Sequence, residues 1–173
     1  MAQGSLLTSL ASLPKEWRLT HDFLPTSYPR ANTKTNSLHL VIGDNAWSTP
    51  AIGFSNNKMS ITSSAAVFTT SPPPVGAWTT IQICQQLVDG RFMLQVSVAG
   101  QEVISEENRT PKDVSDVQVF ASDPWLPAQP GAIRNLVIET KDDSLQGRRE
   151  HLHLVTLSSR LRSLRARSGL HQL

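Results

Sequence analysis

The side chains that could support catalysis are poorly placed for it. Glycoside hydrolysis needs two carboxylates about 5–10 Å apart on one face, and the close glutamate pair in the sequence is Glu106 and Glu107. Neighbouring residues on a strand point to opposite faces, so this pair does not meet the requirement. The same rule separates His21 from Asp22, and Ser27 belongs to no Gly-x-Ser-x-Gly elbow. The sequence therefore predicts that the protein is not an enzyme.

Acidic and amide side chains in two predicted turns carry oxygen atoms of the kind that calcium prefers. These are Asp44-Asn45 and Asn56-Asn57. Calcium needs several oxygen ligands converging at about 2.3–2.6 Å, whereas Asp and Asn residues in loops commonly stabilise the turn itself. The sequence therefore predicts no metal and no cofactor, with calcium at these loops as the alternative left open.

Aromatic and polar loop residues indicate recognition instead. In Asp123-Pro124-Trp125 the proline fixes the turn. The indole of Trp125 then either stacks on a ligand or plugs the end of the domain. We expect a ligand-binding edge made of loop residues, namely Tyr28, Asp44, Asn45, Trp47 and Trp125. Asn108-Arg109-Thr110 is an N-glycosylation acceptor motif, so Asn108 is a candidate glycosylation site.

Period-two alternation of apolar side chains predicts a chain built of short strands. Trp17, His21 and Phe23 share one face of the first, so His21 is expected to be a half-buried histidine whose hydrogen bonds are satisfied. His39, between two leucines, is expected to face solvent. Strands are expected at 17–23, 38–42, 51–54, 59–61, 67–68, 78–87, 92–98, 101–105, 117–121 and 133–140. This pattern predicts an all-β fold, an antiparallel two-sheet β-sandwich of the jelly-roll type.

Charge divides the chain into two parts. Residues 1–140 hold nine Lys/Arg and eleven Asp/Glu, a net charge of −2, whereas residues 141–173 hold seven and three, a net charge of +4. We therefore expect a sandwich domain at 1–140 and a polar linker with a basic tail at 141–173. Leucines at helical spacing make the tail either an amphipathic helix or an unstructured basic segment. A nearly neutral body excludes a nucleic-acid platform, and membrane contact is expected only through the tail.

Several segments of the chain follow one another as they do in a known class of modules. They are "LPKEWRLTHDFLPTSY", "NSLHLVIG", "TPAIGF", "WTTIQICQQLVDGRFMLQVSVAGQEV" and "DVQVFASDPWLPAQPGAIRNLVIET". Over residues 6–140 the sequence resembles the concanavalin A-like, laminin-G-like modules of animal extracellular proteins. Two features depart from the pattern: residues 61–68 lack a cysteine pair, and Ala99-Gly100 replaces Asn-Gly in a hairpin.

The resemblance implies a secreted protein that binds a glycan or an extracellular protein through loops at one edge. Residues 1–13 lack the basic and apolar regions of a secretory signal, and the one cysteine, Cys84, can form no disulfide within the chain. A cytoplasmic location therefore stays open. We predict a non-catalytic recognition module. The alternative is a structural protein that self-associates through sheet edges or through its tail.

Overall fold

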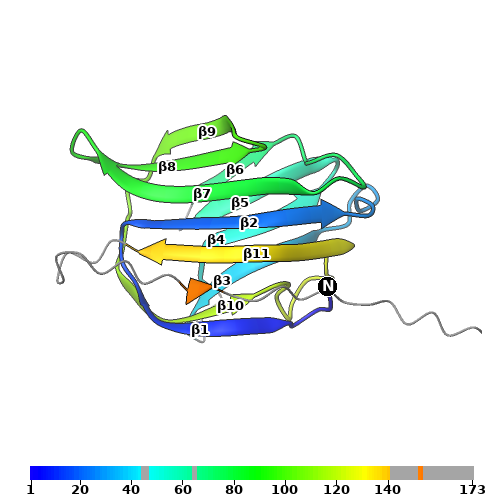
Figure 1. Ribbon diagram of the computed structural model, residues 1–173, viewed down its shortest axis with the longest axis horizontal. Helices are drawn as coiled ribbons and strands as arrows, with labels where there is room; N and C mark the ends of the chain where they lie inside the picture. Colours follow the sequence, from blue (N-terminus) through cyan, green and yellow to red (C-terminus); the bar gives the residue numbers. More distant parts are fainter. Residues whose placement is uncertain (44–46, 64–65, 141–151, 154–173) are drawn as a thin grey trace, which may run out of the picture.

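The computed structural model describes residues 1–43, 47–63, 66–140 and 152–153. They form two six-stranded antiparallel sheets that pack face to face, with no helix among the described residues. Figure 1 shows one sheet in front, with β2, β7 and β11 labelled across it, and the other behind it. The predicted antiparallel two-sheet sandwich is confirmed.

The two sheets take their strands from distant parts of the chain. In spatial order, sheet A contains β1 (Leu6–Leu13), β10 (Val114–Phe120), β3 (Thr35–Ile42), β4 (Trp47–Ser55), β5 (Lys58–Ser63) and β6 (Ala66–Thr70). Sheet B contains β12 (Leu152–His153), β11 (Gly131–Thr140), β2 (Trp17–Pro25), β7 (Thr79–Val88), β8 (Arg91–Val98) and β9 (Gln101–Glu107). Each strand expected from alternation is present, and β1 and β12 are additional strands that alternation did not predict.

The core lies between the sheets and is made of every second side chain of the strands. Its members include Trp17, Leu40, Ile83, Val96 and Leu136, which come from both sheets and are all buried. Full burial of an aliphatic or aromatic side chain of this size contributes about 1.5–3 kcal/mol. Because strand side chains alternate, the same strands leave a second, outer set on each sheet, and any recognition surface must be built from that set and from the loops.

Two-residue turns set the register of three hairpins. Asn56-Asn57, Asp89-Gly90 and Ala99-Gly100 all have positive φ, with values of 49° and 56°, 49° and 77°, and 53° and 80°. Such turns match the right-handed twist of the flanking strands. Ala99 adopts this conformation although its Cβ disfavours it. Because their backbones adopt positive φ, Asn56 and Asn57 form the turn between β4 and β5.

His21 lies on the inward face of β2, as alternation predicts, and it is fully buried. The expectation that its hydrogen bonds are satisfied is wrong, because neither ring nitrogen has a partner among the described residues. Desolvation lowers the pKa of His21 from 6.5 to about 4, although the charge of Asp22 opposes this. The imidazole is therefore neutral at pH 7.

The predicted tail is described only at Leu152 and His153. Their backbones pair with Ile138 and Val137, so β12 extends sheet B beyond β11. The leucines and arginines that suggested an amphipathic helix lie outside the described residues, and the boundary at residue 140 stays a prediction. Within the described ranges, no helix has the length and apolar character that crossing a membrane requires.

Candidate recognition site

The loop of residues 121–130 leaves β10 and runs beside β3 before it enters β11. β10 pairs with β3 as far as Phe120 and His39. Beyond that point the loop pairs with β3 in place of β10. The N–H of Asn36 donates to the carbonyl of Pro127 at 3.2 Å, and the N–H of Gln129 donates to the carbonyl of Asn36 at 2.8 Å. The loop is therefore tied to sheet A by backbone bonds.

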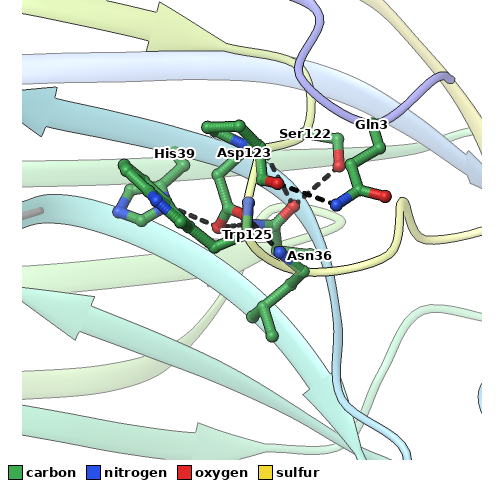
Figure 2. Close-up of polar contacts among 8 residues, drawn as sticks. Gln3, Asn36, His39, Ser122, Asp123 and Trp125 are labelled. Carbon is green, nitrogen blue, oxygen red and sulfur yellow. Dashed lines mark hydrogen bonds and ion pairs between the residues drawn. The ribbon is translucent and has the colours of Figure 1, made fainter.

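The carboxyl group of Asp123 is the centre of a buried polar network (Figure 2). Its Oδ1 accepts the backbone N–H groups of Trp125 at 2.8 Å and Leu126 at 2.7 Å. Its Oδ2 accepts from Nδ2 of Asn36 and lies 2.7 Å from Nδ1 of His39. Both oxygens are thus fully engaged, and the turn that carries Trp125 is fixed to the sheet.

A second layer of bonds holds the same turn from other sides. Oδ1 of Asn36 accepts from Oγ of Ser122 at 3.0 Å and from the N–H of Asp123 at 3.1 Å. From the N-terminal segment, Nε2 of Gln3 donates to the carbonyl of Pro124 at 2.8 Å (Figure 2). Buried polar groups stabilise only when they are paired, so this arrangement gives the turn one defined position.

Trp125 projects from this network and is 53% exposed. Its ring contacts His39 edge-on, with the ring centroids 5.8 Å apart and the planes at 65°. The expectation that His39 faces solvent is wrong. Alternation with Leu38 and Leu40 does place His39 on the outer face, but the returning loop and Trp125 cover it, so it is buried.

The outer face of sheet A carries small side chains next to His39. His39 pairs with Ala51 of β4, which pairs with Thr62 of β5. One row further along, Gly53 pairs with Ser60, and a Cβ at Gly53 would stand 3.0 Å from Oγ of Ser60. The adjacent residues of both strands are in the core. The outer surface of sheet A next to His39 and Trp125 is therefore lined by short side chains, and Ser60 and Thr62 place hydroxyl groups on it.

Tyr28 and Trp47, two of the five residues predicted to form a ligand edge, lie toward opposite ends of the β3–β4 hairpin. Tyr28 packs on Phe54 with ring centroids 5.5 Å apart and donates its hydroxyl to the carbonyl of Pro73 at 2.5 Å. Burial raises the pKa of Tyr28 to about 12. Phe54 pairs with Thr35 at one end of the β3–β4 hairpin, and Trp47 pairs with Ile42 at the other.

The remaining members of that predicted edge divide between undescribed and exposed positions. Asp44 and Asn45 lie outside the described residues, as does the side chain of Trp47. Trp125 has the exposure that a ligand contact needs. Ligand contact by the other four residues stays a prediction. Asn36, His39 and Asp123, which sequence reasoning did not place in the site, hold Trp125 in position.

Asn108 follows β9 in a loop. Its Nδ2, the atom that would carry a glycan, donates to Oε1 of Gln85 at 2.5 Å, and its Oδ1 accepts the N–H of Thr110 at 3.1 Å. Glycosylation at Asn108 would have to break the bond to Gln85, and it stays a prediction.

Calcium binding at the predicted Asx turns also stays a prediction. Oδ1 of Asn56 accepts the backbone N–H of Asn32 at 3.0 Å. The described part of the chain contains no group of three or more His, Cys, Asp or Glu side chains that could hold a metal ion.

No protein-family model matches the sequence, and no curated protein matches it. Solved structures do match in three dimensions. The sialidase of Trypanosoma rangeli has a TM-score of 0.55 and 15% identity over 71% of this chain, which spans 20% of the sialidase. Domains LG4-5 of the mouse laminin alpha1 chain have a TM-score of 0.55 and 19% identity over 88% of this chain and 41% of that one.

A variant of human galectin-16 matches along its whole length, with a TM-score of 0.52 and 11% identity over 82% of this chain. Likenesses at such low identity show the fold. The protein has the concanavalin A-like, lectin-type β-sandwich that laminin G and galectin domains share, as the sequence resemblance implied. The same fold occurs within a sialidase, so the function has to be argued from the site.

Proposed function

We propose that the protein is a non-catalytic recognition module that binds a glycan on the outer face of sheet A, by stacking a sugar ring on Trp125. The observation that carries this proposal is the half-exposed indole fixed over a buried polar network. Aromatic side chains offer a large apolar face and an indole N–H donor, and sugars present both C–H faces and hydroxyl groups. The hydroxyls of Ser60 and Thr62 lie on the same surface.

Rigidity supports the same function. A binding residue that is ordered before the ligand arrives loses less conformational entropy on binding. The bonds from Asp123 to the N–H groups of Trp125 and Leu126 provide such order at the base of the indole. A flexible loop with the same tryptophan would bind more weakly.

The chemistry of the described site favours binding over bond cleavage. A glycosidase of the usual kind needs one carboxylic acid to protonate the leaving oxygen and a second carboxylate across the sugar. In the part of the site that the structure describes, the carboxyl group comes from a single residue, Asp123. Four hydrogen bonds occupy its two oxygens. We therefore propose a role without catalysis.

An extracellular location belongs to this proposal. The fold that the chain shares with a laminin domain and the acceptor motif at Asn108 support it.

Substitution Trp125→Ala should strongly weaken glycan binding with little effect on folding. The residues with the largest binding energy are commonly tryptophans at the centre of a site, so we expect the affinity to fall by about tenfold or more. Because the side chain is half exposed, the melting temperature should change little. A glycan array identifies the ligand, and calorimetric titration of that ligand measures the loss.

Leu87→Ala is the matched control, because Leu87 is an apolar side chain of similar exposure at the far end of β7, in sheet B. It should bind as the unchanged protein does. If Trp125→Ala binds the glycan at full affinity, the proposal is refuted. If the protein binds a protein ligand and no glycan, the ligand of this site is a protein surface and not a sugar.

A second function, self-assembly, is favoured by one observation at the edge of sheet A. β6 is an edge strand without a charged residue, and Val67 in it is 62% exposed. Natural proteins commonly protect edge strands with charges or proline. This edge could pair with the same strand of a second copy.

Assembly through β6 predicts a molar mass that rises with concentration in light scattering, and Val67→Lys should return the protein to a monomer. A variant without residues 141–173 separates this edge from the tail, since it should still associate. A monomer at all concentrations would rule out this second function.

A further inference from the structure

A second polar cluster lies on the outer face of sheet B, away from Trp125. Asp22 of β2 is at its centre. Oγ1 of Thr80 donates to Oδ1 of Asp22 at 2.7 Å, while Nε of Arg134 and Nδ2 of Asn135 donate to Oδ2 at 3.2 Å and 2.8 Å. The guanidinium carbon of Arg134 stands 4.1 Å from the ring centroid of Trp78.

A β-bulge in β11 makes this cluster possible. Arg134 pairs with Asp22 and Val137 pairs with Thr20, so β11 has one more residue than β2 in this interval. Asn135 adopts a φ of 52°. Consecutive residues of a regular strand point to opposite faces, whereas here two consecutive side chains reach the same carboxylate. Bulges occur often where a binding residue has to be re-aimed.

The cluster fixes the guanidinium of Arg134 on two sides. Its guanidinium carbon lies over the ring of Trp78, and its Nε donates to Asp22. Neither terminal nitrogen of Arg134 has a partner among the described residues. These two nitrogens form a planar pair of donors that matches a carboxylate or a sulfate group.

Asp22 keeps the local charge balanced. Partial burial raises the pKa of its carboxyl group, but hydrogen bonds from Thr80, Asn135 and Arg134 outweigh this and lower the pKa overall. The carboxylate is therefore charged at neutral pH and offsets the charge of Arg134. An anion would therefore be recognised here by the arrangement of the hydrogen-bond donors of Arg134 more than by long-range attraction to a net positive charge.

Apolar surface lies beside the two free nitrogens. Trp78, whose ring centroid lies 4.1 Å from the guanidinium carbon of Arg134, is 39% exposed. It belongs to the connector before β7, which Pro72, Pro73 and Pro74 stiffen. A ligand could place an apolar face on the exposed part of Trp78 while its acidic group meets Arg134.

We propose that this cluster is a second binding site, specific for an acidic glycan whose ring lies on Trp78 and whose carboxylate or sulfate is held by Arg134. An acidic peptide fits less well, because it would need several cations. Of the other arginines described on this face, Arg18 is paired with Glu139, and Arg91 lies at the start of β8 opposite Val88, at the other end of β7 from Thr80. The site uses no residue of the Trp125 surface, so it does not depend on glycan binding there.

Nuclear magnetic resonance titration of the full chain tests the site. The probes are a hyaluronan tetrasaccharide, which carries carboxylates, a sulfated chondroitin tetrasaccharide, and chitotetraose, which is neutral. The two acidic probes should shift the indole N–H signal of Trp78 and the amide signals of Asn135 in a saturable way. Chitotetraose should leave these signals unchanged. Because the chondroitin probe carries sulfates in addition to carboxylates, tighter binding of it would identify sulfate as the bound group, and equal or tighter binding of hyaluronan would identify the carboxylate.

Two variants report on the contacts. Arg134→Lys and Trp78→Ala should each lower the affinity for the acidic probe by about fivefold or more. For Arg134→Lys the reason is that lysine cannot offer a fixed pair of donors. Trp78 is partly exposed, so its removal should leave the melting temperature nearly unchanged even if Arg134→Lys does not fold well. Arg18→Lys, on the same face, should bind like the unchanged protein.

Equal shifts with chitotetraose, tighter binding of a tetraglutamate peptide, or full affinity in both variants would overturn the proposal. Signals of the Trp125 surface report separately on the first site, so either site can fail without the other.

Discussion

Acidification from pH 7 to pH 4.5 should cost the protein about 2–3 kcal/mol of stability through His21 alone. The histidine is fully buried, and its pKa is lowered from 6.5 to about 4 in the folded protein. In the unfolded chain it binds a proton below about pH 6.5. Folding must therefore exclude that proton, so the loss begins near pH 6.5 and is complete below about pH 4.

Replacing the histidine isolates this effect. His21→Leu should remove the slope between pH 6.5 and pH 4.5, and at pH 7 it should unfold at the same or a higher urea concentration. The second expectation follows because two buried nitrogens without partners are removed. Asp22 does not interfere: its folded pKa lies below the ordinary value of 3.8, so its stabilising contribution is lost at lower pH than this window. Parallel pH profiles for the two proteins would contradict the assignment.

Asp123→Ala should destabilise the protein by about 3–5 kcal/mol and abolish recognition at Trp125. The substitution leaves the N–H groups of Trp125 and Leu126, and the amide of Asn36, without their buried acceptor. A typical domain has only about 5–15 kcal/mol in total. Urea unfolding measures the loss.

Asp123→Asn serves as the matched variant. Its amide oxygen can still accept the two backbone N–H groups, while its NH₂ group replaces the oxygen that faces Asn36 and His39. Its loss should therefore be smaller than that of Asp123→Ala. A loss under about 1 kcal/mol for Asp123→Ala would show that the network is not what fixes the turn.

The sequence predicts the fold through strands whose two faces differ. β2 and β7 alternate apolar and polar side chains, and both were predicted within two residues at each end. β1 was not, because its leucines stand at positions 6, 7, 10 and 13, a spacing without a period of two. Its register with β10 shifts between Leu6 and Thr8. β1 is an edge strand that forms by pairing with β10, although its own sequence does not alternate.

The site was predictable only in part. A proline-stiffened turn with a tryptophan is visible in the sequence, and a turn in which an Asp accepts N–H groups two and three residues later is a local pattern. The return of that loop along β3 is a tertiary event. It buries His39, which local alternation places in solvent, and it makes Asn36 a partner of residues more than 80 positions away. No pattern in either segment indicates this pairing.

The measurement that bears most directly on recognition at Trp125 is a magnetic resonance titration of the isotope-labelled protein with the best glycan from the array. We expect the indole N–H of Trp125 and the amides of Ala51, Gly53, Ser60 and Thr62 to shift together and to saturate at one affinity. Shifts confined to sheet B or to β6, with the signals of Trp125 unmoved, would contradict a glycan site on the outer face of sheet A.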